Sequence, residues 1–451
     1  MSGEVARPVF VVTCGRSGST LVRYLLDAHP DVVCPPEASL PALIGQLGRS
    51  WNIVVSSAAK EHVAAIPPDV LAEIRSAVQA IMLYSCVQAG KQLYCDKSLD
   101  SVQYLNAVHA VFPSARYILL YRHALDVVMS LLEASPFGFH AYGAAPYLRG
   151  STENFVAPLL QYWNGHVQYA LAWEEAAGDT EAACLRVRYE DLVANPYDTM
   201  EAVCTFLDLP LADDLLTTAF ARPFEHGPAD HKIEFTHEVS AASVGRGVRI
   251  PLEMIPEQIR ESTNGHLTQL GYHTIQEFLA SSSPLPGVPR AGHMPKEIVG
   301  DLLTCLHSGA TAAVAMGIEA AVFKLDEDPD HQWLLKNGEL LELAREVDVV
   351  SDLTVSGTAE GMWRWLIGGD NVGALLRARW IRYSSATLDT GQVYECLRRL
   401  TTLVNGRGGD TEKAIGTSSL PSTGEWLPQL GEGVTLSSGS DLLGQGLGPC
   451  R

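Results

Sequence analysis

The sequence is poor in positive charge and in cysteine, and no uncharged apolar stretch reaches the roughly 18 residues that suggest a membrane-spanning helix. It contains 32 Lys and Arg against 52 Asp and Glu, a formal net charge of −20. Such a surface repels nucleic acid and anionic membranes, so we expect no nucleic-acid partner and no stable membrane insertion. Any anionic ligand must be held by local positive groups. The nine cysteines lack paired short spacings, which excludes a disulfide scaffold and argues against a zinc ribbon.

The 451 residues favour a folded chain of two or three domains, at roughly 100–200 residues per domain. Hydrophobic residues make up 47% of the sequence and charged residues 19%, which excludes global disorder. Residues 1–8 include Glu4 and no apolar run, unlike a secretory signal. We therefore expect a cytoplasmic protein.

Two stretches rich in small and turn-forming residues divide the sequence. Residues 281–295 read SSSPLPGVPRAGHMP, a composition typical of a linker. The Gly- and Ser-rich stretch at the C-terminal end is typical of a flexible tail. The predicted organisation is a first domain at 1–280, a linker at 281–295, a second domain at 296–404 and a tail at 405–451.

Strand-like and helix-like patterns alternate in the first domain. A β-branched run at 9–13 is followed by a small-residue loop at 14–20 and then by apolar residues at helical spacing. A second unit combines a strand at 117–121 with a helix at 124–132, and a third strand is expected at 183–187. Short buried strands that alternate with helices predict an α/β domain with a parallel sheet flanked by helices.

The second domain has a different pattern. Alternating runs at 318–325 and 331–335 precede an Asn-Gly pair at 337–338, which is a strong hairpin signal. A strand-like stretch at 347–356 and a helix at 358–367 follow. This mixture predicts a smaller α+β domain of ordinary size.

The loop at 14–20, CGRSGST, has the composition of an anion-binding turn. Backbone N–H groups at a helix start, together with the helix dipole, favour a phosphate there. The two glycines allow close approach of the backbone, the hydroxyl side chains add donors, and Arg16 adds a cationic fork. The spacing fits neither a Walker A motif nor a nucleophile elbow. An ordinary turn between a strand and a helix remains the alternative.

Further polar and positive residues follow other predicted strands. Arg122 comes directly after the strand at 117–121, Ser130 lies about two helical turns later, and Lys97 precedes the second unit. Because parallel strands place their carboxyl ends at one edge of the sheet, we expect Arg16, Arg122 and Lys97 to lie at the same rim. Three cations and several hydroxyls at one rim of an acidic protein predict a site for a polyanionic nucleotide.

Four dispersed segments resemble sulfotransferases that use 3′-phosphoadenosine-5′-phosphosulfate (PAPS), above all the tyrosylprotein sulfotransferases and their bacterial relatives. They are VFVVTCGRSGSTLVRYLLDAHPDVVCPPE, CDKSLDSVQYLNAVHAVFPSARYILLYRHALDVVMS, VRYEDLVANP and SVGRG. The resemblance covers roughly residues 8–280 in the same order. It implies a Rossmann-like sulfotransferase fold with a P-loop-type first turn, and an enzyme that uses PAPS as co-substrate.

The resemblance also assigns cofactor contacts. In this family the first loop grips the 5′-phosphosulfate, an arginine and a serine hold the 3′-phosphate, a tyrosine lies near the adenine, and a late S-x-G-R-G segment closes over the nucleotide. The matching residues here are Arg16, Ser17, Gly18, Ser19 and Thr20 in the loop, Arg122 and Ser130, Tyr189, and Ser243, Arg246 and Gly247 in the late segment, with Lys232 as a further candidate.

The catalytic set implied by the resemblance is Glu37, Lys97, Arg16 and Ser243. Glu37 stands where the family has the base that takes the proton of the acceptor hydroxyl. Lys97 and Arg16 would stabilise negative charge on the transferring group, Ser243 would assist, and no metal is required. Without the motif, Glu37 would be interpreted as a carboxylate at a helix start and Lys97 as a solvated charge.

Two features bear on the acceptor and on redox state. Cys34 and Cys95 fall where secreted members carry a disulfide, but without a secretion signal we expect two nearby free thiols. The substrate-side arginine that the family has after Ser130 is replaced by the apolar and acidic stretch at 131–134. We therefore expect a small or lipophilic acceptor hydroxyl, as in natural-product biosynthesis. The sequence leaves homo-oligomerisation open.

The second domain resembles the sterol-carrier-protein fold over the segment from His331 to Tyr383. That family binds lipids in a hydrophobic tunnel, so the resemblance implies a lipophilic acceptor or an interaction module. Core packing is the alternative role of Trp363, Trp365 and Trp380. Two other functions stay open for the whole chain: a nucleotide-dependent phosphotransferase with an atypical phosphate loop, and a non-catalytic protein that binds lipid or nucleotide.

Overall fold

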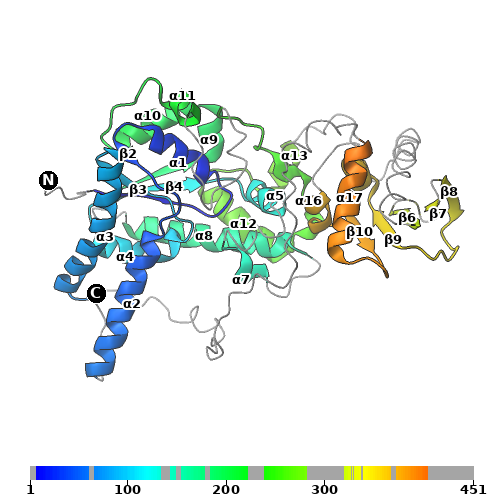
Figure 1. The fold of residues 1–451 in the computed structure, drawn as a ribbon, viewed down its shortest axis with the longest axis horizontal. Coiled ribbons are helices and arrows are strands. Elements are labelled where there is room, and N and C mark those ends of the chain that lie inside the picture. Colours follow the sequence, from blue (N-terminus) through cyan, green and yellow to red (C-terminus); the bar gives the residue numbers. More distant parts are fainter. Residues whose placement is uncertain are drawn as a thin grey trace. The chain divides into compact units, whose positions relative to one another are not determined.

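The computed structural model describes eleven segments of the chain (Figure 1). They are 7–59, 66–133, 143–148, 154–177, 183–221, 238–281, 319–326, 328, 330–336, 339–366 and 372–404. The predicted linker after residue 281 and the predicted tail lie outside these segments, so the domain boundaries remain predictions.

A five-stranded parallel sheet forms the centre of the N-terminal part (Figure 1). Its strands are β1 (Val9–Val12), β2 (Val32–Val33), β3 (Leu93–Asp96), β4 (Arg116–Tyr121) and β5 (Ala183–Arg188). Their order is β2-β3-β1-β4-β5, and every neighbouring pair is parallel. The predicted α/β class is therefore confirmed for this part.

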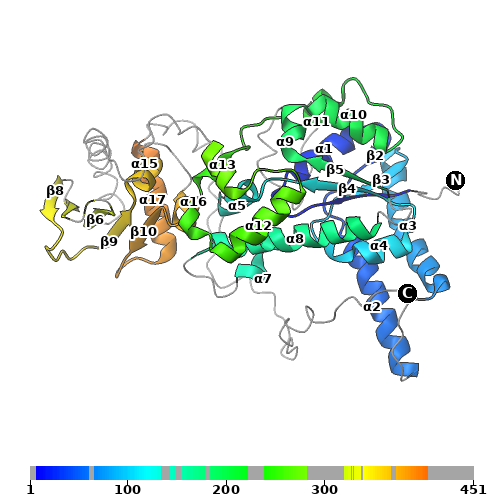
Figure 2. The ribbon, with the colours of Figure 1, turned by 180° about the vertical axis from the view of Figure 1, so that it is seen from behind.

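Both faces of the sheet are covered by helices (Figures 1 and 2). One apolar cluster packs Val9 and Val11 against α1 (Ser19–Ala28), α9 (Tyr189–Ala194), α10 (Pro196–Phe206) and α11 (Leu215–Ala221). A second cluster packs Phe10 and Val12 on the opposite face. Its helices are α2 (Leu40–Ala59), α3 (Pro68–Ala89), α4 (Leu105–Val111), α5 (Ala124–Glu133), α8 (Val156–Ala177) and α12 (Glu257–Gln269). A strand buried on both faces is apolar at every position, which is why β1 shows no alternation.

The strand order places a switch point beside β1. From β1 the chain moves to β2 and β3 on one side, and then to β4 and β5 on the other. In open parallel sheets, ligands bind outside the carboxyl ends of the strands at such a point. The turns after β1, β3 and β4 therefore meet at the edge where the sequence predicts the nucleotide.

Smaller elements complete this part. They are η1 (Ser101–Tyr104), α7 (Ala145–Leu148), η3 (Arg246–Arg249), η4 (Leu252–Met254) and α13 (Ile275–Ser281). Among the described residues, α3 is the one helix long and apolar enough to cross a membrane by length and composition, and 22% of its apolar window is buried. One such helix is weak evidence for a span, so the absence of membrane insertion remains a prediction.

The described residues of 319–404 form a mixed sheet with three helices. The strands are β6 (Ala320–Leu325), β7 (His331–Lys336), β8 (Glu339–Ala344), β9 (Leu353–Gly357) and β10 (Ile381–Ser384), in the order β10-β9-β6-β7-β8. The helices are α15 (Ala359–Leu366), α16 (Val372–Arg377) and α17 (Thr390–Val404). Lys336 pairs with Glu339 across β7 and β8, as expected for a hairpin, although residues 337–338 lie outside the described segments. The strand expected at 347–356 begins only at Leu353, because the preceding stretch is charged and lacks alternation.

Candidate active site

The turn between β1 and α1 has a backbone that depends on small residues. Arg16 and Gly18 both have left-handed backbone angles, with φ of 68° and 94°. A Cβ atom on Gly18 would lie 2.2 Å from the ring of Tyr189, so only glycine fits there. Helix α1 begins at Ser19 without a side-chain cap. Its first backbone N–H groups are therefore suited to an anion.

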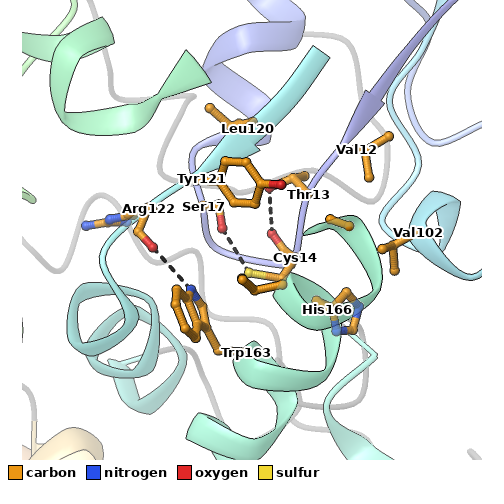
Figure 3. A pocket seen from close by; sticks show the side chains of 12 residues that line it. Val12, Thr13, Cys14, Ser17, Val102, Leu120, Tyr121, Arg122, Trp163 and His166 are labelled. Carbon is orange, nitrogen blue, oxygen red and sulfur yellow. Dashed lines mark hydrogen bonds between the residues drawn. The ribbon is translucent and has the colours of Figure 1, made fainter. Parts of the chain in front are cut away.

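A layer of side chains under this turn holds it in place (Figure 3). The backbone N–H of Gly15 donates to the Tyr162 hydroxyl at 2.7 Å. The Cys14 thiol lies 3.0 Å from the Ser17 hydroxyl, and burial raises the pKa of that thiol to about 11. A cavity of about 10 Å³, about the size needed for one water molecule, lies in the same layer. The Ser17 side chain therefore faces the interior of the protein. The contact with an anion that the sequence predicts for Ser17 would be made by its backbone.

Arg122, directly after β4, connects three segments. Its guanidinium donates to the Arg16 carbonyl at 3.0 Å and to the Ser243 carbonyl. It also lies 4.5 Å from the centre of the Tyr189 ring. Its Nε is buried, and among the described residues it has no hydrogen-bond partner. A buried cationic donor without an acceptor is unusual, and it fits a site that is completed by an anion.

Tyr189 and Ser130 close the same cluster. The Tyr189 hydroxyl lies 2.6 Å from Ser243 Oγ, and Arg16 Nε donates to Ser130 Oγ at 3.0 Å. The structure therefore brings together five predicted residues, which lie between positions 16 and 243 of the sequence. The contacts of each residue with particular atoms of a nucleotide remain a prediction.

Asp126 anchors the late S-x-G-R-G segment, and the sequence reasoning missed it. Its carboxylate accepts from the backbone N–H of Gly247 at 2.7 Å and of Gly245 at 2.8 Å. A Cβ atom on Gly247 would lie 2.4 Å from the Leu125 backbone, so a glycine is required there. Burial raises the pKa of Asp126, against the charge of Arg122. An acid inside the apolar stretch ALDVVMSLL was the available sequence signal.

Two other predicted contacts have different surroundings. Arg246, which the resemblance places on the 3′-phosphate, forms an ion pair with the buried Glu133 in this structure. Ser19 and Thr20 lie in the first turn of α1. Lys232 lies outside the described residues, as does the aromatic segment 137–142, for which the sequence leaves open a lining of the acceptor pocket or the packing of a mobile lid.

The predicted catalytic pair is formed at the neighbouring strand end. Lys97 Nζ donates to Glu37 Oε1 at 2.6 Å, and the two side chains are 2% and 18% exposed. Lys97 follows β3, which pairs with β1. Tyr162, which binds Gly15, has its pKa raised by burial and to a smaller extent by the charge of Glu37. The pair therefore lies at the end of the strand that neighbours β1, whose own end carries the turn at 14–20.

Cys34 and Cys95 lie on the same side of the site. Both are buried and free, and they belong to the same apolar cluster, each directly after a paired position of β2 and β3. Burial and the contact with Cys34 raise the pKa of Cys95. The two nearby free thiols expected from the resemblance are present.

This geometry describes an α/β protein with a cluster of positive and hydroxyl groups at one sheet edge and a carboxylate–lysine pair at a neighbouring strand end. In agreement, residues 8–213 match the model of the sulfotransferase family. The match falls within the stretch of roughly 8–280 over which the sequence resembles sulfotransferases, and it agrees with that resemblance.

Individual relatives agree with the family match. Over 210 residues the chain is 27% identical to protein-tyrosine sulfotransferase A of Caenorhabditis elegans and 28% identical to protein-tyrosine sulfotransferase 1 of Danio rerio. These alignments cover 46% of this chain and 51% and 55% of the relatives, so the chain spans about half of their length. The solved sulfotransferase domain from the curacin biosynthetic pathway is 19% identical, covers 60% of this chain and 99% of its own, and has a TM-score of 0.42, too low to carry an argument.

The relatives correct one expectation. The loss of a family arginine after Ser130 led to the prediction of a small or lipophilic acceptor. Curated relatives from several animals are named protein-tyrosine sulfotransferases, so that prediction is wrong. A single changed position on the acceptor side was too little to define the acceptor class.

Proposed function

We propose that this chain transfers a sulfuryl group from PAPS to a tyrosine hydroxyl of a protein. The observation that carries the proposal is the 2.6 Å pair of Lys97 and Glu37, formed at the edge of the sheet where Arg16 and Arg122 also meet. The tyrosine acceptor is supported by the names of the relatives. The P-loop-type reading of the first turn is supported by the uncapped start of α1.

The residues that would hold PAPS are those of the cluster around Arg122. The backbone of residues 15–20 and Arg16 are suited to the 5′-phosphosulfate, and Arg122 with Ser130 to the 3′-phosphate. The unpartnered Nε of Arg122 and the close approach of Tyr189 to Gly18 fit this assignment. When bound, PAPS supplies the sulfuryl group and the bisphosphate leaving group.

The catalytic roles follow from charge and position. Glu37 accepts the proton of the acceptor hydroxyl, which makes the oxygen a better nucleophile. Lys97 stabilises negative charge that develops near the transferring group, in a buried site where such an interaction is strong. Arg16 contributes in the same way, and Ser243 holds Tyr189 and Arg122 in position.

Transfer is tested directly with the full chain, PAPS and tyrosine-containing proteins or peptides. We expect mass spectrometry to find one sulfuryl group on tyrosine and none on matched phenylalanine peptides. Thermal unfolding should shift upward with adenosine 3′,5′-bisphosphate more than with ATP or GTP, because a ligand stabilises in proportion to RT ln(1 + [L]/Kd). Stabilisation by ATP alone, or a phosphorylated product, would contradict the proposal.

Arg122→Lys tests the nucleotide site separately. Lysine keeps the charge but loses the planar fork, so we expect about 10-fold weaker binding of adenosine 3′,5′-bisphosphate by calorimetry. The control is Arg382→Lys, which alters an ion pair with Asp326 in the sheet of 319–404. Equal affinities of the two variants would remove Arg122 from the nucleotide site.

Three further assignments are part of the proposal. Residues 319–404 are proposed as a sterol-carrier-protein-like interaction module, supported by the mixed sheet and by α15, whose Trp365 is fully buried in the core. Limited proteolysis of the full chain tests the predicted boundary at 281–295. A cytoplasmic location is tested by fractionating the cells that make the protein.

A further inference from the structure

Glu37 lies in a short segment without regular structure. Residues 34–39 connect β2 to α2 and are neither helix nor strand. A general base must be held within hydrogen-bond reach of its proton, and a loop side chain is poorly placed for this unless its backbone is fixed. The contacts at the two ends of this segment therefore matter for catalysis.

Helix α1 fixes the first end. Arg23 Nη1 donates to the Cys34 carbonyl at 3.2 Å, and the Cys34 N–H donates to Asp27 Oδ1 at 2.9 Å. Arg23 and Asp27 are four residues apart and so lie on one face of the helix. The backbone at Cys34 is held on both its donor and its acceptor side.

The turn after β3 fixes the second end. The Ser39 N–H donates to Ser98 Oγ at 2.8 Å, and the Leu40 N–H donates to Asp96 Oδ2 at 3.4 Å. Both Asp96 and Ser98 are fully buried. Ser39 has a left-handed backbone angle, with φ of 51°, which a non-glycine residue keeps only when its surroundings hold it.

Lys97 stands between the two residues that make these bonds. Its side chain binds Glu37, while the side chains on either side bind the backbone that follows Glu37. Three consecutive residues, 96–98, thus bind both the side chain of the base and the backbone that follows it. The other carboxylate nearby is Asp100, whose pKa is raised by burial and by the charge of Glu37.

We propose that Ser98 and Asp96 are positioning residues for the general base: Ser98 holds the Ser39 N–H and Asp96 holds the Leu40 N–H, so that Glu37 is presented to Lys97. Loss of the Ser98 hydroxyl leaves the Ser39 N–H without its acceptor and releases the segment at one end. The inference rests on the proposed function, because it explains how Glu37 is positioned to act as the general base.

The test combines kinetics with a binding measurement. Ser98→Ala should lower kcat for sulfuryl transfer by about 10- to 100-fold, because misplacement of a reacting group by about 1 Å has effects of this size. The KM for PAPS should change by less than about twofold, since none of these bonds belongs to the nucleotide cluster. Ser98→Thr keeps a hydroxyl and should recover most of the turnover. Ser76→Ala is the matched control: the Ser76 hydroxyl bonds only to its own helix, at the Ala72 carbonyl.

A double variant separates positioning from general damage. If Ser98 acts through Glu37, then Ser98→Ala should have almost no further effect on kcat in a Glu37→Ala background. An equal loss of kcat in both backgrounds would overturn the inference and leave the proposed function intact. Asp96→Asn, which keeps an acceptor oxygen for Leu40, should lower kcat less than Ser98→Ala does.

Hydrogen exchange tests the inference without any transfer assay. In Ser98→Ala the amides of Ser39 and Leu40 should exchange faster than in the wild type, with no change in β4. If the wild type transfers no sulfuryl group, the proposed function fails, and this exchange pattern still shows whether the contact holds the segment. Unchanged exchange at Ser39 would sink the inference. If Ser98→Ala does not fold, Asp96→Asn is measured in the same two ways.

Discussion

Two ion pairs of equal length occur in the two sheet regions of this chain. Lys97 and Glu37 are 2.6 Å apart and 2% and 18% exposed. Arg364 and Glu360 in α15 are also 2.6 Å apart and 6% and 18% exposed. The first pair joins residues 60 positions apart in two loops, and the second joins residues four positions apart in one helix. Length and burial alone therefore do not distinguish a catalytic pair from a structural one.

The surroundings of the two pairs make the difference. Arg364 donates to Glu360 through both Nε and Nη2 and lies 5.0 Å from the ring centre of Trp380, so its fork is engaged within the fold. Lys97 makes a single bond to a carboxylate at the carboxyl edge of a parallel sheet, next to an anion-binding turn. A buried pair of this kind is costly to form, and its retention at such an edge is typical of a functional site.

The largest expected difference between the pairs is in turnover. Glu37→Gln and Lys97→Ala should each lower kcat by about 100-fold or more, while nucleotide binding survives Glu37→Gln. Glu360→Gln should leave kcat unchanged and lower only the melting temperature. Steady-state kinetics and thermal unfolding on the same samples make the comparison. A normal kcat for Glu37→Gln would remove the assigned base.

A second prediction concerns Asp96, next to Lys97, and the dependence of the protein's stability on pH. Burial raises the pKa of Asp96 to about 6, so between about pH 4 and pH 6 the native state holds a proton that the unfolded state has lost. The free energy of unfolding should therefore fall as pH rises through this window, by up to about 3 kcal/mol. Asp96→Asn should remove this part of the pH dependence. Urea unfolding across the window measures it, and identical slopes for wild type and variant would contradict the assignment.

A third difference comes from two crowded glycines. A Cβ atom would lie 2.4 Å from the Leu125 backbone at Gly247 and 2.2 Å from the Trp380 carbonyl at Gly361. Gly247→Ala and Gly361→Ala should each reduce the free energy of unfolding by about 1–3 kcal/mol. Only Gly247→Ala should also weaken binding of adenosine 3′,5′-bisphosphate, because it displaces the segment that Asp126 anchors. Equal nucleotide affinity in both variants would separate that segment from the site.

The smallest effect is expected at Gly265 in α12. No other atom lies within 4 Å of a Cβ built there, and alanine favours a helix more than glycine does. Gly265→Ala should raise the free energy of unfolding by about 0.5–1 kcal/mol without changing turnover. Gly265→Ala is the control for Gly247→Ala. If Gly265→Ala were less stable than the wild type, the space around a glycine Cβ would not predict the effect of alanine on stability in this chain.

Much of the site follows from short-range sequence patterns. The strand runs before Arg16 and Arg122 are short and uniformly apolar, which predicts parallel strands, and parallel strands place their following turns on one edge. The same reasoning placed Lys97 there, although the strand before it was not identified. The four-residue run of 93–96, LYCD, and the two-residue length of β2 gave no clear strand period.

Other parts of the site depend on contacts between distant segments. Asp126, Tyr162, Ser98 and Asp96 were not predicted, and each acts on backbone from 56 to 147 positions away. A buried hydroxyl or carboxylate has no periodic signature, because its role depends on which backbone group the fold brings against it.

By itself, the sequence determined the α/β class of the N-terminal part, the small-residue turn after β1 and several of the residues at the sheet edge, because strand polarity and small-residue loops are local properties. Only the tertiary structure decided that Arg246 pairs with Glu133, that Ser17 faces the interior, and that Asp96 and Ser98 hold the backbone beside Glu37. These three features depend on long-range hydrogen bonds and on burial. The energies of such contacts depend on partner groups that lie far away in the sequence.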